Sequence, residues 1–196
     1  TYVMGIVNTT PDSFSGDGVV DVEAAVERGV QMEKDGADIL DIGGESTRPG
    51  STPVSLEEEL ARVIPVIRGL AAKVQIPLSI DTYKAEVALQ ALEAGASVIN
   101  DVWGGHMEPE ILRVAAEKRV PIILMHNRSK PQDAAQTAKL GGRYVGVGYE
   151  KLLEDIQREL RESIDAALAA GVTKENIIID PGIGFGKTVE QNLELV

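Results

Sequence analysis

Ile39-Leu40-Asp41-Ile42-Gly43-Gly44-Glu45-Ser46-Thr47-Arg48-Pro49-Gly50 reads as a buried strand that runs directly into polar and cationic side chains. Asp41 lies inside the apolar run, and two glycines end the run before Glu45. Carboxylates, hydroxyls and a guanidinium enter a protein core only when they find polar partners there. The stretch therefore predicts the rim of a site. A solvated strand-to-helix loop with a Pro-Gly turn is the alternative.

The composition is that of a globular chain. With 196 residues, 43% hydrophobic and 26% charged, the chain is long enough for one domain with a sizeable core. A net charge of −12 excludes a nucleic-acid surface, which needs clustered Lys and Arg. The absence of cysteine excludes disulfides, thiolate metal sites and cysteine nucleophiles, and two histidines are too few for a histidine-rich zinc centre.

Nothing in the sequence indicates a membrane partner. There is no apolar run of about 18 residues and no signal-peptide pattern, so we expect a cytoplasmic protein. Thr1 to Asn8 begins almost inside a strand and has no initiator Met, so we expect that the chain is trimmed at its front.

Strand-like and helix-like segments alternate along the chain. The predicted strands are Tyr2–Val7, Asp38–Gly43, Pro77–Asp81, Ser97–Asp101, Pro121–His126 and Asn176–Asp180. The predicted helices are Asp21–Lys34, Ser55–Ala72, Lys84–Glu93, Pro109–Arg119, Tyr149–Ala170 and a segment that starts at Thr188. Residues 127–148 show no period, which predicts a lid or a disordered loop.

Six strand-then-helix units without a hairpin signal imply a parallel sheet with its connections on the outside. A doubly wound open sheet and a (β/α)8 TIM barrel both have this pattern. Polar residues near the end of almost every strand favour the barrel, whose strands all end at one mouth: Asn8, Glu45, Asp81, Asn100, His126 and Asp180. A barrel has eight units over about 250 residues. We therefore expect residues 1–196 to be an incomplete TIM barrel domain with about six of eight β/α units, the units after residue 196 missing.

Three strand ends carry candidate ligand-binding side chains. Asp180 ends an Ile-Ile-Ile run, where a carboxylate is costly unless a group donates to it, so ligand binding is predicted. Asp81 and Asn100 also end apolar strands, so ligand binding is predicted for them too, although one of them could instead cap the next helix.

The neighbouring side chains have plainer interpretations. His126 is predicted to be a satisfied structural residue rather than a metal ligand or base. Met125 and Phe185 are predicted to form pocket wall or core. The glycine-rich turn Asp180–Lys187 approaches a phosphate loop, but Pro181 occupies the position of the first glycine, which excludes nucleoside triphosphate binding of that type.

Taken together, several motifs resemble the dihydropteroate synthases, a family of pterin-binding barrels. The resemblance spans the whole chain, and its motifs are residues 8–15, 41–50, 80–82, 100–101, 124–126 and 180–187. It implies a (β/α)8 barrel of folate biosynthesis, a sulfonamide target and a homodimer at full length. It also implies that 4-aminobenzoate is joined to (7,8-dihydropterin-6-yl)methyl diphosphate, giving 7,8-dihydropteroate and pyrophosphate with the help of Mg²⁺.

The resemblance also implies how the pterin is held. An aminopyrimidinone edge has adjacent N–H donors, and the carboxylate of Asp180 can accept two of them in parallel. Asp81 and Asn100 are implied to satisfy the remaining ring nitrogens and oxygen, with Met125 and Phe185 as further substrate-binding residues.

For the leaving group, the resemblance implies Asn8 as the metal residue, through Mg²⁺, and Thr47 and Arg48 on the phosphate oxygens. Arg48 and Asp81 are the implied catalytic residues. Early cleavage of the C–O bond requires no protein nucleophile. The loop Thr9–Gly18 is expected to fold over the site, and Glu45 has no assigned role.

The sequence departs from the family at its end. In the family a lysine and a serine after the seventh strand, and an Arg-x-His after the eighth, complete the site, and the sequence stops at Val196 before either. We expect the isolated chain to be poorly stable or to associate, and to show no detectable synthase turnover.

Two alternatives stay open. A methyltetrahydrofolate-corrinoid methyltransferase type of barrel shares the Asp and Asn contacts but has no use for Thr47 and Arg48. A non-catalytic pterin-binding protein is the other.

Overall fold

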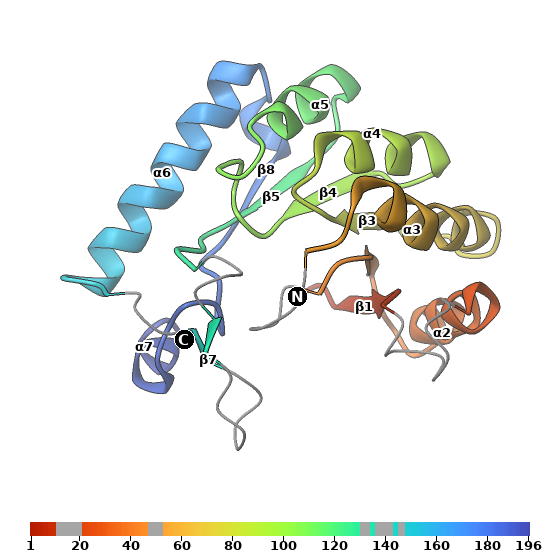
Figure 1. Ribbon diagram of the computed structural model, residues 1–196, viewed down its shortest axis with the longest axis horizontal. Helices are drawn as coiled ribbons and strands as arrows, with labels where there is room; N and C mark the ends of the chain where they lie inside the picture. The colour runs from red at the N-terminus through yellow and green to blue at the C-terminus, as the bar shows by residue number, and fades with distance from the viewer. Residues whose placement is uncertain (11–20, 47–52, 130–133, 136–142, 145–147) are drawn as a thin grey trace.

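The computed structural model describes residues 1–10, 21–46, 53–129, 134–135, 143–144 and 148–196. One parallel sheet of six strands organises it (Figure 1). Its strands are β1 (Met4–Asn8), β2 (Ile39–Gly43), β3 (Leu78–Asp81), β4 (Val98–Asp101), β5 (Ile122–Met125) and β8 (Ile177–Asp180). The helices are α2 (Val22–Lys34), α3 (Leu56–Ala71), α4 (Ala85–Ala94), α5 (Glu110–Lys118), α6 (Leu152–Ala170) and α7 (Val189–Glu194).

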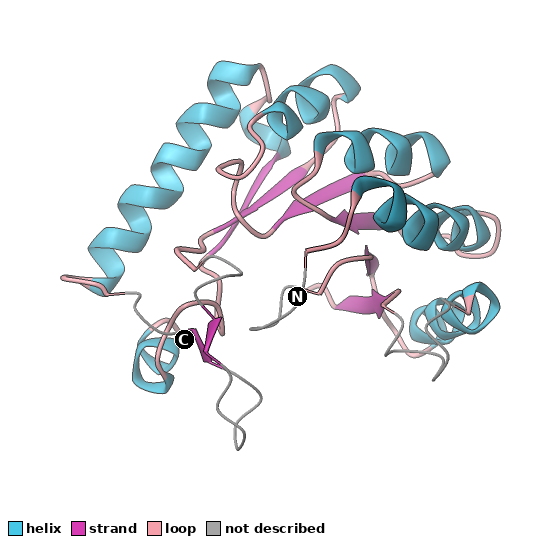
Figure 2. Ribbon diagram, in the orientation of Figure 1, coloured by secondary structure: helices cyan, strands magenta, loops and turns pink. Residues whose placement is uncertain are grey.

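The strand order separates the two architectures that the sequence allowed. It runs β1-β2-β3-β4-β5-β8, so each strand of the sheet pairs with the next one in the chain. A doubly wound sheet reverses direction at a switch point, and no reversal occurs here. The helices α2 to α6 lie in an arc outside the strands, as Figure 2 shows. This is barrel-type winding, although the sheet is not closed within the described residues and β1 and β8 form its two edges.

The long connection after β5 contains regular structure that the sequence did not predict. Two short strands, β6 (Ala134–Ala135) and β7 (Arg143–Tyr144), pair antiparallel there, which contradicts a disordered loop at these residues, whereas the lid stays a prediction. Strands of two residues are too short for alternation to be read from sequence. A 3₁₀ turn at Lys174–Asn176 before β8 was also missed, whereas Asn8 is the last residue of β1, at the strand end where the sequence placed it.

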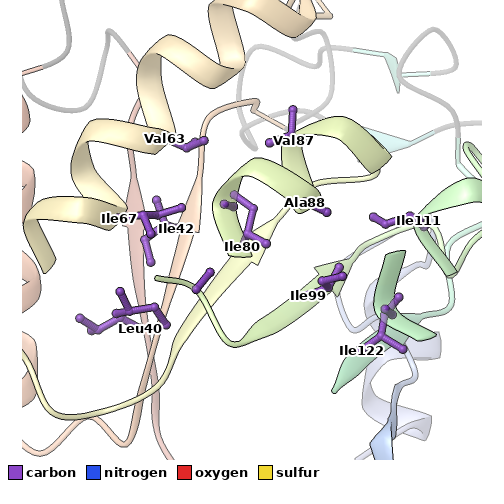
Figure 3. Close-up of a cluster of buried hydrophobic side chains, with 14 of the residues drawn as sticks. Leu40, Ile42, Val63, Ile67, Ile80, Val87, Ala88, Ile99, Ile111 and Ile122 are labelled. Carbon is purple, nitrogen blue, oxygen red and sulfur yellow. The ribbon is translucent and has the colours of Figure 1, made fainter. Parts of the chain in front are cut away.

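The core lies between the sheet and the helix arc. The outward-facing strand residues Leu40, Ile42, Ile80, Ile99 and Ile122 are fully buried against Val63, Ile67, Val87, Ala88 and Ile111 of the helices (Figure 3). Each buried aliphatic side chain contributes about 1.5–3 kcal/mol relative to exposure. Because side chains alternate along a strand, the residues between them face the concave side of the sheet. These include Asp41, Ser79, Asp81, Asn100 and Asp180.

Two glycines bring helices α2 and α3 together. A Cβ on Gly29 of α2 would lie 2.5 Å from Cδ2 of Leu70, and a Cβ on Gly69 of α3 would lie 2.6 Å from Cγ2 of Val26. Both contacts are closer than atoms can approach, so each helix needs a residue without a side chain at the crossing. In the described part of the chain, no helix has both the length and the apolarity to cross a membrane.

We predict that Gly29→Ala destabilises the protein, although alanine is the better helix former. The gain in helix propensity is about 1 kcal/mol, whereas overpacking a core costs about 1–3 kcal/mol. Urea unfolding should therefore show a lower midpoint for Gly29→Ala, and Gly29→Ala/Leu70→Val should recover part of the loss. An unchanged or higher midpoint for the single variant would contradict the close packing of α2 on α3.

Candidate active site at the carboxyl end of the sheet

The register of the sheet brings the predicted site residues to one edge. Asn8 pairs with Gly43, Gly43 with Asp81, Asp81 with Asn100, and Met125 with Asp180. Neighbouring strands are about 4.8 Å apart, so these side chains line the carboxyl end of the sheet on its concave side. The structure therefore assembles Asn8, Asp81, Asn100, Met125 and Asp180 into one rim.

Below the rim, Asn100 is held by a buried carboxylate. Its Nδ2 donates to Oδ2 of Asp41 at 2.9 Å. Asp41 is buried, and within the described structure neither its Oδ1 nor Oγ of the adjacent Ser79 has a hydrogen-bond partner by distance and angle. Burial raises the pKa of Asp41 above its ordinary value. The concave face is thus acidic well below its rim.

Asp81 lies in the middle of this acidic environment. Burial raises its pKa well above the ordinary range, and the charges of Asp41, Glu59, Asp101 and Glu45 raise it further. Helix α4 starts with Lys84 at the N-cap position and without a side-chain cap, so the alternative that Asp81 caps this helix was wrong. Its carboxyl group is left to face the rim.

Asp101, next to Asn100, has a different role. Its two carboxyl oxygens accept the backbone N–H groups of Trp103 at 2.9 Å and Gly105 at 2.7 Å. Burial raises the pKa of Asp101 to about 6. Asp101 therefore holds the turn after β4, while the alternation of the strand leaves Asn100 on the concave face.

Glu45, which had no predicted role, forms an ion pair. Nζ of Lys84 contacts Oε2 of Glu45 at 2.5 Å and also Oε2 of Glu59, which is fully buried on α3. Burial opposes the charge on Lys84, but the hydrogen bonds that it donates to Glu45 and Glu59 raise its pKa above the ordinary value. The three residues tie the end of β2 to helices α3 and α4. The partners lie 39 and 25 residues apart in sequence, so no local pattern pointed to them.

The turn after β8 fixes Asp180. Its Oδ1 accepts the N–H of Gly182 at 2.7 Å, and its carbonyl accepts the N–H of His126 at 2.9 Å. Gly182 has a φ of +70°, and a Cβ there would lie 2.1 Å from the carbonyl oxygen of His126. Only glycine allows the turn to lie this close to the end of β5. Phe185 of the same turn packs on a small apolar cluster with Met125, Trp103, Val102 and Tyr83.

His126 is buried and has a partner at each ring nitrogen. Nε2 lies 3.0 Å from Oε2 of Glu159, and Nδ1 lies 3.2 Å from Nζ of Lys187. Burial and the charge of Lys187 lower the pKa of His126. This agrees with the interpretation of His126 as a structural residue.

A hollow of about 310 Å³ lies outside the rim, between the end of β5 and helix α6. Asp81, Asn100 and Asp180 are absent from its lining, which consists of His106, Met125, His126, Asn127, Arg158, Glu159, Glu162 and Ser163. Asp81, Asn100 and Asp180 therefore face a different region, on the concave side of the sheet, and of the predicted substrate-binding residues only Met125 lines this hollow within the described structure.

The remaining predicted residues are only partly covered. Thr47, Arg48 and most of the loop Thr9–Gly18 lie outside the described residues. Asn8 is exposed at the end of β1. Where the chain is described, no group of three or more His, Cys, Asp or Glu is arranged to hold a metal ion.

Comparison with known proteins places this geometry in a family. The family described as "Pterin binding enzyme" matches residues 4–196. A dihydropteroate synthase of Clostridium beijerinckii is 52% identical over 195 residues, covering 99% of this chain and 66% of the relative. The solved Xanthomonas albilineans dihydropteroate synthase with 4-aminobenzoic acid is 49% identical with a TM-score of 0.85, covering 99% of this chain and 66% of that one. The same enzyme in complex with 7,8-dihydropteroate gives 45% identity and a TM-score of 0.81, covering 99% and 65%.

The solved relatives are TIM barrels, which confirms the predicted fold class. This chain spans slightly less than two thirds of the length of the relatives quoted, at 66% and 65%. The motifs from Asn8 to Lys187 and all six strands of the sheet lie within the matched residues 4–196. The chain belongs to the pterin-binding enzyme family.

Proposed function

We propose that the protein containing this chain, at the full length of its relatives, is a dihydropteroate synthase. It condenses 4-aminobenzoate with (7,8-dihydropterin-6-yl)methyl diphosphate and releases 7,8-dihydropteroate and pyrophosphate. The observation that carries the proposal is the rim of Asp81, Asn100 and Asp180 on one face of the sheet. The 52% identity to the Clostridium beijerinckii dihydropteroate synthase supports the same reaction.

The rim suits a pterin ring. The Asp180 carboxylate accepts one backbone N–H from Gly182 and has lone pairs left for two parallel N–H donors of an aminopyrimidinone edge. Asn100 on β4 and Asp81 on β3 lie two and three strands away from β8, toward the β1 edge, and offer an amide and a carboxyl group for the other ring atoms. The cluster of Met125 and Phe185 supplies apolar surface for the ring face. Each of these assignments is part of the proposal.

The reaction breaks the bond between the pterin methylene carbon and the diphosphate oxygen. The amine nitrogen of 4-aminobenzoate forms the new C–N bond and loses one proton, and the diphosphate leaves with the bonding electron pair. Positive charge develops on the methylene carbon if the C–O bond breaks first. A concave face rich in carboxyl groups favours such charge, while Thr47 and Arg48 are proposed to hold the phosphate oxygens.

Asn8 fits Mg²⁺ only as a single protein ligand. Its amide oxygen is the hard type of donor that Mg²⁺ accepts, and Mg²⁺ often takes its remaining ligands from phosphates and water. The lack of a three-residue acidic or histidine cluster in the described regions is consistent with metal that arrives with the diphosphate. When bound there, Mg²⁺ neutralises charge on the leaving group. A cytoplasmic location and a homodimer at full length complete the proposal.

We predict that Arg48→Ala in the full-length protein lowers kcat/KM for pteroate formation by about 100-fold, because it removes a charge-assisted contact to the leaving group. Pyrophosphate release measures the rate, and Arg113→Ala on the exposed surface of α5 is the control. If the wild-type full-length protein formed no pteroate, the proposed synthase function would be refuted. An unchanged rate in Arg48→Ala would remove Arg48 from leaving-group stabilisation and favour the methyltransferase alternative.

We predict that Asp81→Asn stabilises the protein while it lowers activity. Because the folded state raises the pKa of Asp81, the unfolded state releases this proton first as the pH increases, and wild type loses stability from about pH 4 upward. The amide introduced by Asp81→Asn does not titrate, so the variant does not lose stability in this way as the pH rises. The melting temperature of Asp81→Asn should therefore exceed that of wild type at pH 8, and the difference should shrink toward pH 4.

The activity of Asp81→Asn should fall about 10- to 100-fold, as expected for one lost hydrogen bond to a charged group of about 1.5–3 kcal/mol. Asp165→Asn on the exposed face of α6 controls for the loss of one negative charge. A lower melting temperature at pH 8 would contradict the acidic environment inferred for Asp81.

We predict that Asn8→Ala raises the Mg²⁺ concentration needed for half-maximal rate several-fold, with activity recovered at high Mg²⁺, because one of several oxygen ligands is lost. Titration of the chelated enzyme with Mg²⁺ measures this. Asn176→Ala, in the turn before β8, is the matched control. An unchanged Mg²⁺ dependence would exclude Asn8 from the metal site.

A further inference from the structure

Lys187 is the one lysine of the glycine-rich turn, and its ammonium points back into the turn. Nζ donates to the carbonyl oxygen of Gly182 at 2.8 Å and to that of Phe185 at 3.0 Å. Its third contact is Nδ1 of His126 at 3.2 Å. An ammonium has three N–H donors, so all of them are engaged by protein atoms. This lysine closes the turn on itself and does not present a charge to a phosphate.

The contact with His126 fixes the protonation of the ring. An ammonium cannot accept a hydrogen bond, so Nδ1 of His126 must be the acceptor. The ring proton is therefore on Nε2, which donates to Oε2 of Glu159 at 3.0 Å. Burial and the charge of Lys187 both lower the pKa of His126, as expected for a neutral ring. The interaction with Glu159 is a hydrogen bond of neutral histidine and not an ion pair.

Glu159 is itself held firmly on α6. Nε of Arg128 donates to its two carboxyl oxygens at 3.1 and 2.8 Å, and Arg128 lies over the ring of Tyr149 at 4.3 Å. Arg128 lowers the pKa of Glu159 to about 2. An unbroken chain of polar contacts thus runs from helix α6 through His126, at the end of β5, to the turn after β8.

The turn that Lys187 closes contains two proposed pterin contacts. Asp180 starts the turn, and its carboxylate direction is set by the N–H of Gly182, the residue whose carbonyl Lys187 holds. Phe185 lies at the other side of the turn, and Lys187 holds its carbonyl as well. The charge of Lys187 is also close enough to Asp180 to interact with it, although burial dominates and lowers the pKa of Lys187 to about 8. One ammonium therefore restrains both ends of the turn.

We propose that Lys187 is a positioning residue of the pterin site, which orients the Asp180 carboxylate and the Phe185 ring through the carbonyls of Gly182 and Phe185. Neutral His126 is its anchor on β5. The inference rests on the proposed function, since it assumes that Asp180 and Phe185 contact the pterin. It gives a specific task to a lysine and a histidine that take no part in the reaction itself.

The test uses Lys187→Met in the full-length protein, which keeps an unbranched side chain that is one atom shorter and removes the ammonium donors. We expect the KM for the pterin diphosphate to rise about tenfold, which corresponds to about 1.4 kcal/mol, with kcat changed less. Calorimetric binding of 6-hydroxymethyl-7,8-dihydropterin should weaken by a similar factor. Lys174→Met, an exposed lysine before β8, is the matched control and should retain wild-type values. Lys187→Arg keeps donors and should recover part of the affinity.

Pterin affinity equal to wild type in Lys187→Met would overturn the inference. An equal rise in KM for both substrates, measured well below the melting temperature, would overturn it as well. If Lys187→Met does not fold, the His126→Phe variant tests the inference instead, because it removes the Nδ1 acceptor of Lys187 and keeps a buried ring. It should weaken pterin binding several-fold, and unchanged binding would overturn the inference. Wild-type enzyme without pteroate formation is a separate result, which refutes the proposed function.

Discussion

The ion pairs of Lys84 with Glu45 and Glu59 are the interaction on which the rest of the site depends. Glu45 follows β2, Glu59 is on α3 and Lys84 starts α4, so two successive β/α units meet at one ammonium. Removing one partner of a buried ion pair leaves an uncompensated charge and costs about 3–5 kcal/mol. The ammonium thus compensates two carboxylates that lie close enough to the half-buried Asp81 to raise its pKa. Without it, Glu45 and Glu59 would lose this cationic partner at the carboxyl end of the sheet.

Lys84 does not neutralise this region completely, and the acidic character that remains affects which ligands the face favours. Both Asp41 and Asp81 keep raised pKa values, chiefly because of burial. A face of this kind is unfavourable for an anion and favourable for a ring with several N–H donors, or for a carbon that becomes positive during bond cleavage. For the proposed synthase, this predicts that the diphosphate is held from outside this face, by the proposed Arg48 contact and the proposed Mg²⁺. Within the proposed function, electrostatics alone thus favours a pterin side and a separate phosphate side.

The sequence predicted the parts of the structure that depend on local pattern. Alternating strands and helices, helix ends at Gly95 and Gly171, and polar strand ends such as Asp180 are each encoded within a few residues. Pairings across the sheet are different. Asn100 and Asp41 are 59 residues apart, and Lys187 and His126 are 61 apart. A single sequence contains no signal for such contacts, because only the register of the strands brings the partners together. For that reason Glu45 had no predicted role, although its carboxylate anchors the site.

The glycine-rich turn shows how far a motif can be interpreted without the structure. Its sequence differs from a phosphate loop at Pro181, which was sufficient to exclude that function but not to assign another. In a phosphate loop the lysine extends toward the ligand, whereas Lys187 turns inward because two carbonyls and an imidazole nitrogen are within reach. Those acceptors exist only because Gly182 lets the turn lie against the end of β5. The same residue types therefore fix the turn that contains the Asp180 carboxylate, which in the proposed function accepts N–H groups of a ring rather than binding a phosphate.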